Sequence, residues 1–78
     1  MAKVKVFSTP TCPWCDRVKQ FLKENGIEFE DINVAENRDA LVEMVTKTHQ
    51  MGVPVVEIDG EYIIGFDEKK LREMLNIQ

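Results

Sequence analysis

The sequence of 78 residues predicts an α/β fold in which one four-stranded mixed sheet is flanked by three helices. Three observations indicate this fold class. Two successive segments each change from a strand-like to a helix-like spacing of apolar residues, which is typical of a parallel strand pair. Two short apolar runs then flank the dipeptide Asp59-Gly60, as in a hairpin. A final helical pattern follows, so the expected element order is βαβαββα.

The first strand is expected at residues 3–7, where lysine alternates with valine. A Pro-rich turn then leads into the first helix, with Pro13 in its first turn, where the missing proline N–H is not needed. Gly26 is expected to end this helix. Apolar residues at helical spacing predict one buried stripe, formed by Trp14, Val18, Phe21 and Leu22.

The second strand is expected at residues 29–33, and Asn37 is the expected N-cap of the second helix. The inner face of that helix is predicted to consist of Leu41, Met44, Val45 and Thr48.

Residues 55–58 and 61–64 are the expected hairpin strands. Asp59-Gly60 between them suits a type I′ turn, because both residues tolerate positive φ. Asp67 is expected to cap the last helix, whose predicted buried residues are Leu71, Met74 and Leu75.

Composition narrows the classes of function. The 10 basic and 14 acidic residues give a net charge of −4, which offers no positive surface for nucleic acid. No apolar run approaches the ~20 residues that a membrane span needs, and residues 1–7 lack the apolar stretch of a signal peptide. We therefore expect a cytoplasmic monomer, with residues 1–78 as a single domain, that binds neither nucleic acid nor membranes.

Both cysteines lie within residues 9–17, TPTCPWCDR. Cys12 directly precedes the predicted helix, where unpaired N–H groups and the helix dipole favour a thiolate and lower the pKa of the thiol below the free value of about 8.5. Cys15 follows one helical turn later on the same face, near enough for a disulfide. Cys12 is thus the candidate nucleophile, and Cys15 is the candidate thiol that resolves a mixed disulfide.

A cysteine pair can also bind a metal or form a structural disulfide. A zinc site needs more ligands than this pair supplies, and the chain adds only His49 and carboxylates. An iron–sulfur cluster or zinc shared by two protomers through Cys12 remains the alternative function. A purely structural disulfide would close a very short loop and would be reduced in the cytosol. Redox chemistry is therefore the favoured interpretation.

Three motifs occur together, and each lies next to a predicted element: Cys12-Pro13-Trp14-Cys15, Val53-Pro54 and Gly65-Phe66-Asp67. In this combination they resemble the glutaredoxins of the thioredoxin superfamily, and the resemblance covers essentially the whole chain. It implies a thioredoxin-like fold. It also implies a disulfide oxidoreductase that reduces protein disulfides or glutathione mixed disulfides through its two cysteines, without a tightly bound cofactor.

The resemblance also assigns binding roles. Pro54 would be a cis proline facing the sulfurs, Val53 would offer its main chain to an extended peptide or to glutathione, and Gln50 would meet the glycyl carboxylate of glutathione. Simpler interpretations remain, namely a strand start for Pro54 and a solvated loop residue for Gln50. For Gly65 and Asp67, which would receive the γ-glutamyl carboxylate, the simpler roles are a turn and a cap. The predicted substrate or glutathione site comprises Thr11, Pro13, Trp14, Gln50, Val53, Pro54, Gly65, Phe66 and Asp67.

Some positions depart from the usual glutaredoxin pattern. Thr9 stands where many members carry a basic residue, which removes a charge that would hold a glutathione carboxylate. Ile64-Gly65 replaces a double glycine and is similar to the glutaredoxin-like hydrogen donors of ribonucleotide reductase, which take electrons from thioredoxin reductase. The expected reductant is therefore either glutathione, as co-substrate, or a flavoprotein reductase, and ribonucleotide reductase is a candidate partner. Trp14 is either a substrate contact or part of the packing.

Overall fold

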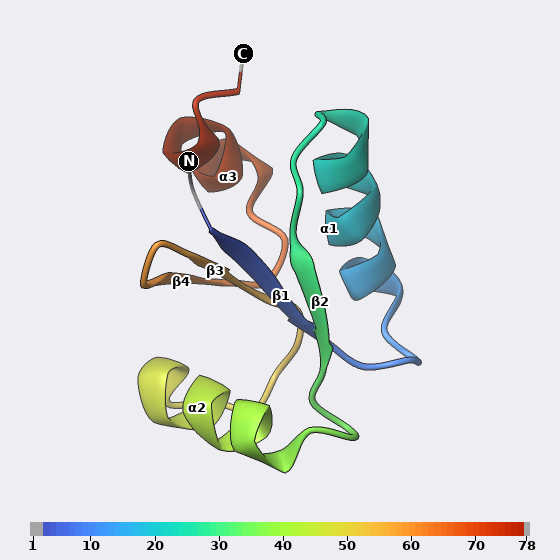
Figure 1. Ribbon diagram of the computed structural model, residues 1–78, viewed down its shortest axis with the longest axis vertical. Helices are drawn as coiled ribbons and strands as arrows, with labels where there is room; N and C mark the ends of the chain where they lie inside the picture. The colour runs from blue at the N-terminus through green and yellow to red at the C-terminus, as the bar shows by residue number, and fades with distance from the viewer. Residues whose placement is uncertain (1–2, 78) are drawn as a thin grey trace.

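A computed structural model describes residues 3–77 and confirms the predicted element order. The strands form one four-stranded sheet in the order β2-β1-β3-β4. Figure 1 shows α1 and α3 on one face of this sheet and α2 on the other. The elements are β1 (Val4–Ser8), α1 (Pro13–Glu24), β2 (Glu30–Asn33), α2 (Arg38–Thr48), β3 (Val55–Ile58), β4 (Glu61–Ile64) and α3 (Glu68–Leu75).

The strand directions bring the three sequence motifs to one edge of the sheet. β1 and β2 are parallel, as predicted, whereas β3 pairs antiparallel with both β1 and β4. Phe7 faces Val55 across the β1–β3 pair, and Val55 faces Ile64 across the β3–β4 pair. The end of β1, the start of β3 and the end of β4 therefore lie together. The segments that carry Cys12, Pro54 and Gly65 leave the sheet at this shared edge.

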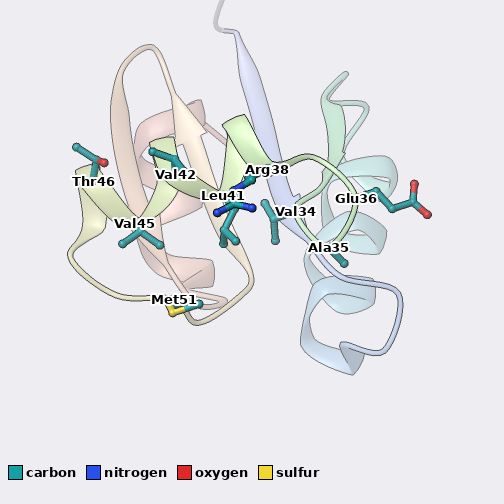
Figure 2. A pocket seen from close by; sticks show the side chains of 9 residues that line it. All are labelled: Val34, Ala35, Glu36, Arg38, Leu41, Val42, Val45, Thr46 and Met51. Carbon is teal, nitrogen blue, oxygen red and sulfur yellow. The ribbon is translucent and has the colours of Figure 1, made fainter.

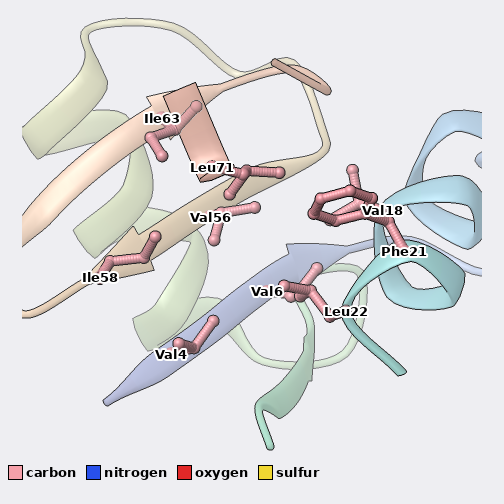
Figure 3. Packing of buried hydrophobic residues seen from close by; sticks show 9 residues of the cluster. All are labelled: Val4, Val6, Val18, Phe21, Leu22, Val56, Ile58, Ile63 and Leu71. Atoms are coloured by element: carbon pink, nitrogen blue, oxygen red, sulfur yellow. The ribbon is translucent and has the colours of Figure 1, made fainter. Parts of the chain in front are cut away.

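Two hydrophobic clusters hold the layers together, one on each face of the sheet. The cluster between the sheet and α2 consists of Phe7, Val34, Ala40, Met44 and Val55. Consecutive apolar residues in β1 and β3 belong to opposite clusters, because successive side chains of a strand point to opposite faces. The cluster under α1 and α3, drawn in Figure 3, consists of Val4, Val6, Val18, Phe21, Leu22, Val56, Ile58, Ile63 and Leu71.

The predicted buried stripe of α1 is wrong at its first residue. Trp14 is 56% exposed, and the buried residues of the helix are Cys15, Val18, Phe21 and Leu22. A stripe that begins at Cys15 continues at Val18 and Leu22 with the spacing of one helix face. Trp14 is rotated by about 100° from Cys15 around the helix axis, so it lies outside the buried stripe.

Smaller differences concern the element ends and the edges of the core. β1 begins at Val4 and continues to Ser8, and β2 begins at Glu30, one residue later than expected. In α2 and α3 only Met44 and Leu71 of the predicted inner faces are fully buried, while Ala40 also lies in the core. The other predicted inner-face residues are only partly buried because each of these helices is covered on one side alone: Leu41, Val45, Thr48, Met74 and Leu75.

The predicted ends of the helices are confirmed by hydrogen bonds. Asn37 accepts the N–H of Ala40 at 3.0 Å and thereby caps α2. Gly26, with φ +69°, follows α1, and its N–H bonds to the carbonyl of Lys23 at 3.1 Å. A left-handed residue at this place suits glycine because it has no Cβ to clash. Local sequence signals therefore set the helix ends.

The hairpin turn has the predicted type. Asp59 and Gly60 have φ values of +49° and +91°, and positive φ at both central residues defines a type I′ turn. This turn matches the twist of β3 and β4 and brings the end of β4 back to the shared edge.

Tyr62 of β4 is expected to make the protein less stable as the pH rises from about 10 to about 12. Burial, a hydrogen bond donated to Glu43 at 2.9 Å and the charges of Glu57 and Glu43 raise its pKa from 10.0 to about 12. In this interval the unfolded chain releases the tyrosine proton while the folded chain keeps it. The free energy of unfolding therefore decreases with pH, and the contribution of Tyr62 is complete below pH 10.

The Tyr62→Phe variant tests this dependence. Below about pH 10 it should be less stable than the wild type by about 1 kcal/mol, because one hydrogen bond is lost. Between about pH 10 and 12 the two stabilities should converge, since the variant has no phenol to titrate. Urea unfolding followed by circular dichroism at a series of pH values gives the free energy of unfolding of both proteins. If the stabilities of the two proteins changed in parallel through this interval, the pH dependence would not come from Tyr62.

Candidate active site

Cys12 is the N-cap of α1. Its backbone is extended, with φ −112° and ψ 103°, and Pro13 occupies the first helical position. The N–H of Cys15 donates a hydrogen bond to Cys12 Sγ at 3.1 Å, so the sulfur takes the place that a capping oxygen usually has. A sulfur at this position receives both an N–H dipole and the positive end of the helix dipole. This geometry favours a negative charge on Cys12.

The cysteine pair forms a disulfide, as predicted from the spacing. The Cα atoms of Cys12 and Cys15 are 5.2 Å apart, within the usual range for such a bond. The two residues differ in exposure, because Cys12 is partly exposed whereas Cys15 is fully buried (0%). A reaction partner can therefore reach the sulfur of Cys12, and Cys15 lies behind it.

The Val53–Pro54 peptide bond is cis. Pro54 is buried and directly precedes β3, while Val53 is partly buried. The carbonyl of Pro54 accepts a hydrogen bond from the N–H of Gly65 at 2.8 Å, which joins the loop before β3 to the loop after β4. The orientation of Pro54 toward the sulfurs stays a prediction that the shared sheet edge supports.

An aromatic contact connects the start of α1 to the loop after β4. The rings of Trp14 and Phe66 have centroids 6.4 Å apart, and Phe66 also makes an edge contact with Phe21 at 5.6 Å. The Arg17 guanidinium lies 5.0 Å from the centre of the Trp14 ring, a cation–π distance. Trp14 is thus largely exposed and packs against Phe66, and its role as a substrate contact stays a prediction.

The Arg17 side chain is exposed, and its guanidinium lies against the Trp14 ring. The sequence spacing indicates this contact, since residues three apart on a helix are neighbours. Ser8, the one buried polar residue within residues 3–77, had no such signal. Its hydroxyl donates to Asp31 Oδ1 at 2.8 Å, and Asp31 also pairs with Lys19 at 3.1 Å. This pairing joins three elements that only the fold brings together.

Gly65 and Asp67 have the simpler roles that were considered for them. Gly65 has φ +78° in the turn after β4. Asp67 is exposed and caps α3 by accepting the N–H of Lys70 at 3.1 Å. The main chain between them leads into a helix N-terminus, which is a favourable place for an anion. Their role toward a glutathione carboxylate stays a prediction.

The side-chain amide of Gln50 forms hydrogen bonds within its own loop. Its Oε1 accepts the N–H of Gly52 at 2.6 Å, and its Nε2 donates to the carbonyl of Gly52 at 3.0 Å. The remaining predicted site residues, Thr11 and Pro13, are exposed on either side of Cys12. Of the predicted binding residues from other segments, Phe66 contacts the cysteine loop through Trp14, whereas the amide of Gln50 bonds to the main chain of Gly52.

A hollow that is not lined by the cysteine loop lies between α2 and the loop that follows β2 (Figure 2). Its volume is about 450 Å³, and Val42 and Met51 on it are 56% and 69% exposed. None of its residues was predicted as part of the site. It is lined by Val34, Ala35, Glu36, Arg38, Leu41, Val42, Val45, Thr46 and Met51.

Two further observations concern the described chain, residues 3–77. No three His, Cys, Asp or Glu side chains there group closely enough to hold a metal ion. No helix in that range has the length and apolar character to cross a membrane.

Comparison with known proteins gives consistent results. Residues 4–63 match the glutaredoxin family. A glutaredoxin-like 8.6 kDa protein of the rubredoxin operon of Clostridium pasteurianum is 43% identical over 72 residues, which cover 92% of this chain and 96% of that protein. Glutaredoxin 3 of Escherichia coli K12 is 32% identical over 68 residues, which cover 87% of this chain and 82% of the relative.

Solved structures agree with the fold. A mutant of the thioredoxin-like protein BC3987 has a TM-score of 0.92 and 37% identity, with 100% of both chains covered. The NrdH-redoxin of Escherichia coli shares the fold, with a TM-score of 0.81 at 22% identity and 92% and 93% of the two chains covered. With a cysteine pair at the start of α1, a cis proline before β3 and the family match over most of its length, the chain belongs to the glutaredoxin family and is a glutaredoxin-like thiol–disulfide oxidoreductase with a CxxC redox centre.

Proposed function

We propose that the protein reduces disulfides of other proteins, with Cys12 as the nucleophile and Cys15 as the resolving thiol. The observation that carries this proposal is the difference between the two sulfurs. Cys12 is accessible, and its sulfur accepts the N–H of Cys15 at the N-terminus of α1. Cys15 is fully buried (0%) behind it. This arrangement suits an attack by Cys12 on an external disulfide and an internal attack by Cys15.

The reaction transfers two electrons in two exchange steps. The thiolate of Cys12 attacks one sulfur of the substrate disulfide, and the S–S bond breaks to release a substrate thiolate that takes a proton from water. Cys15 then loses its proton and attacks the sulfur of Cys12. The mixed disulfide breaks, the second substrate thiolate leaves and is protonated, and the Cys12–Cys15 disulfide forms. The substrate is reduced and the dithiol is oxidised.

The segments at the shared sheet edge are the proposed substrate contacts. Val53 would offer its main chain to an extended segment of the substrate, beside Pro54. Trp14, backed by Phe66 at 6.4 Å, would form an apolar wall on the opposite side of Cys12. Aromatic side chains give large contact areas at low entropic cost, so this wall suits the surface of a protein more than a small ligand.

The electron donor that we propose is a flavoprotein reductase of the thioredoxin reductase kind. Two observations support it against glutathione. Thr9 provides no positive charge beside Cys12, and the Gln50 amide is bonded to the main chain of Gly52. Glutathione is the competing donor. A buckwheat glutaredoxin with 28% identity and a TM-score of 0.76, covering 97% of this chain and 72% of its own, was solved as a glutathione complex.

The donor is tested by reducing the oxidised protein in two parallel reactions, one with millimolar glutathione and one with NADPH and a thioredoxin reductase. Trp14, the only tryptophan, reports the change by fluorescence, and thiol labelling confirms it. We expect fast reduction by the flavoprotein and slow reduction by glutathione. The Thr9→Arg variant should accelerate the glutathione reaction by about fivefold, which corresponds to about 1 kcal/mol for one new ion pair.

One outcome would contradict the proposed electron donor. Fast reduction of the wild type by glutathione, with no further gain from Thr9→Arg, would assign glutathione as the donor. The two-cysteine mechanism would be unaffected, because it does not depend on the source of the electrons.

A further inference from the structure

Gln50 forms a closed set of hydrogen bonds within the loop between α2 and β3. Its Oε1 accepts the N–H of Gly52 at 2.6 Å, while its Nε2 donates to the carbonyl of Gly52 at 3.0 Å and lies 3.4 Å from the hydroxyl of Thr48. That hydroxyl bonds in turn to the carbonyls of Met44 and Gln50, at 2.7 and 3.1 Å. The side chain thus ties the main chain of Gly52 to the last turn of α2.

The Gln50 side chain fills the space beside Gly52 that a larger residue would need. A Cβ at position 52 would lie 2.6 Å from Gln50 Oε1, closer than real contacts allow. The other three glycines, Gly26, Gly60 and Gly65, have positive φ, and an added Cβ would meet nothing within 4 Å at any of them. Gly52 has no such φ. A side chain at position 52 would therefore have to push the end of the Gln50 side chain away from the main chain of Gly52.

The clamped residue directly precedes the cis Val53–Pro54 bond. On the far side of this bond the carbonyl of Pro54 is held by the N–H of Gly65 at 2.8 Å. The main chain of residues 52–54 is therefore fixed at both ends, by Gln50 and by the loop after β4. A segment that is ordered before binding does not have to be ordered by the substrate, which increases affinity.

Both amide hydrogens of Gln50 have acceptors inside the protein, the carbonyl of Gly52 and the hydroxyl of Thr48. A carboxylate on a small ligand would have to displace one of them, and it would gain only an uncharged donor. Leaving the carbonyl of Gly52 without its partner would add a further cost. This geometry argues against direct binding of a ligand by Gln50.

We propose that Gln50 is a positioning residue for protein substrates: by clamping Gly52 it presents the main chain of Val53 to an extended segment of a disulfide-bearing protein. The proposal rests on the proposed function, because it assumes that proteins are the substrates. It replaces the role that the family resemblance suggests for Gln50, contact with the glycyl carboxylate of glutathione. The two roles make different predictions for Gly52, which touches Gln50 and has no side chain of its own.

The test uses the full chain with three variants: Gln50→Ala, Gly52→Ala and both together. Gln20→Ala, on the exposed side of α1, is the matched control. Steady-state reduction of insulin measures the reaction with a protein disulfide. The rate with dithiobis-nitrobenzoate, a small disulfide without a peptide chain, measures the reactivity of Cys12 itself. A third substrate, a glutathionylated peptide, detects any direct role toward glutathione.

We expect each single variant to raise KM for insulin by about tenfold with little change in kcat, because preorganisation of the loop is lost. The double variant should equal the single variants, since both remove the same clamp. The rate with the small disulfide should stay at the wild-type value in all variants, which also shows that they fold. Gln20→Ala should match the wild type with every substrate.

Two results would overturn the proposal. One is a wild-type KM for insulin in Gly52→Ala. The other is a loss confined to the glutathionylated peptide in Gln50→Ala, which would assign the direct contact instead. A failure of the proposed function is distinguishable, because the wild type would then not reduce insulin at all.

Discussion

The Cys12→Ser variant is expected to lose reduction of every disulfide substrate, by more than about 10³-fold. A serine hydroxyl at this position is neutral at physiological pH and cannot form a disulfide with the substrate. The remaining thiol, Cys15, is buried and cannot reach an external disulfide. The measurement is insulin reduction coupled to NADPH consumption, with wild type and variant at equal concentration.

The same substitution provides its own control for folding. Serine is a good N-cap, and its hydroxyl can accept the N–H of Cys15 that Cys12 Sγ accepts at 3.1 Å. The start of α1 should therefore be preserved, and thermal unfolding of the variant should match that of the reduced wild type within a few degrees. Substantial activity in a folded Cys12→Ser protein would show that another group is the nucleophile.

The Cys15→Ser variant is expected to stop at the mixed disulfide. Cys12 can still attack a protein disulfide, but the chain has only two cysteines, so no second thiol is present to release the product. Turnover of protein disulfides should fall by about 10²-fold or more, and a covalent adduct of enzyme and substrate should accumulate. Mass spectrometry under non-reducing conditions detects this adduct. Removal of glutathione from a glutathionylated peptide needs one thiol and should continue when free glutathione is supplied.

Burial of Cys15 calls for a second variant. A hydroxyl at a fully buried position costs about 1–3 kcal/mol if it finds no partner, whereas Cys15→Ala avoids this cost at the price of a small void. Both variants should accumulate the same adduct, because neither has the resolving thiol. Normal turnover in either one would mean that Cys15 does not resolve the intermediate.

The amino-acid sequence determined most of the secondary structure, because the relevant interactions are local. Asn37 and Asp67 cap their helices through N–H groups three residues later, as predicted. Asp59-Gly60 makes its turn through its own backbone angles. The position of Cys12 also follows from local sequence, since Pro13 begins α1 and leaves the preceding residue at the cap. The place of Cys12 at the start of α1 is therefore a local property of the sequence.

Side-chain burial was predicted less well, and Trp14 is the clearest case. A periodic pattern shows that one face of a helix is apolar, but that face is about 100° wide or more. The rotation of the helix is decided by the sheet against which it packs. Burial of Cys15 in place of Trp14 followed from this rotation, which left Cys15 inaccessible and Trp14 exposed beside Phe66.

Only the tertiary structure decided how the site residues are used. The isomer of the Val53–Pro54 bond could not be derived from the sequence, because the trans form is favoured by only about 0.5–1 kcal/mol before proline. The amide of Gln50 could equally have faced a ligand, whereas in the fold it bonds to the main chain of Gly52. The sequence by itself thus determined which residues carry the redox chemistry. The fold decided how the other predicted site residues are placed, because their placement depends on contacts between neighbouring loops and layers.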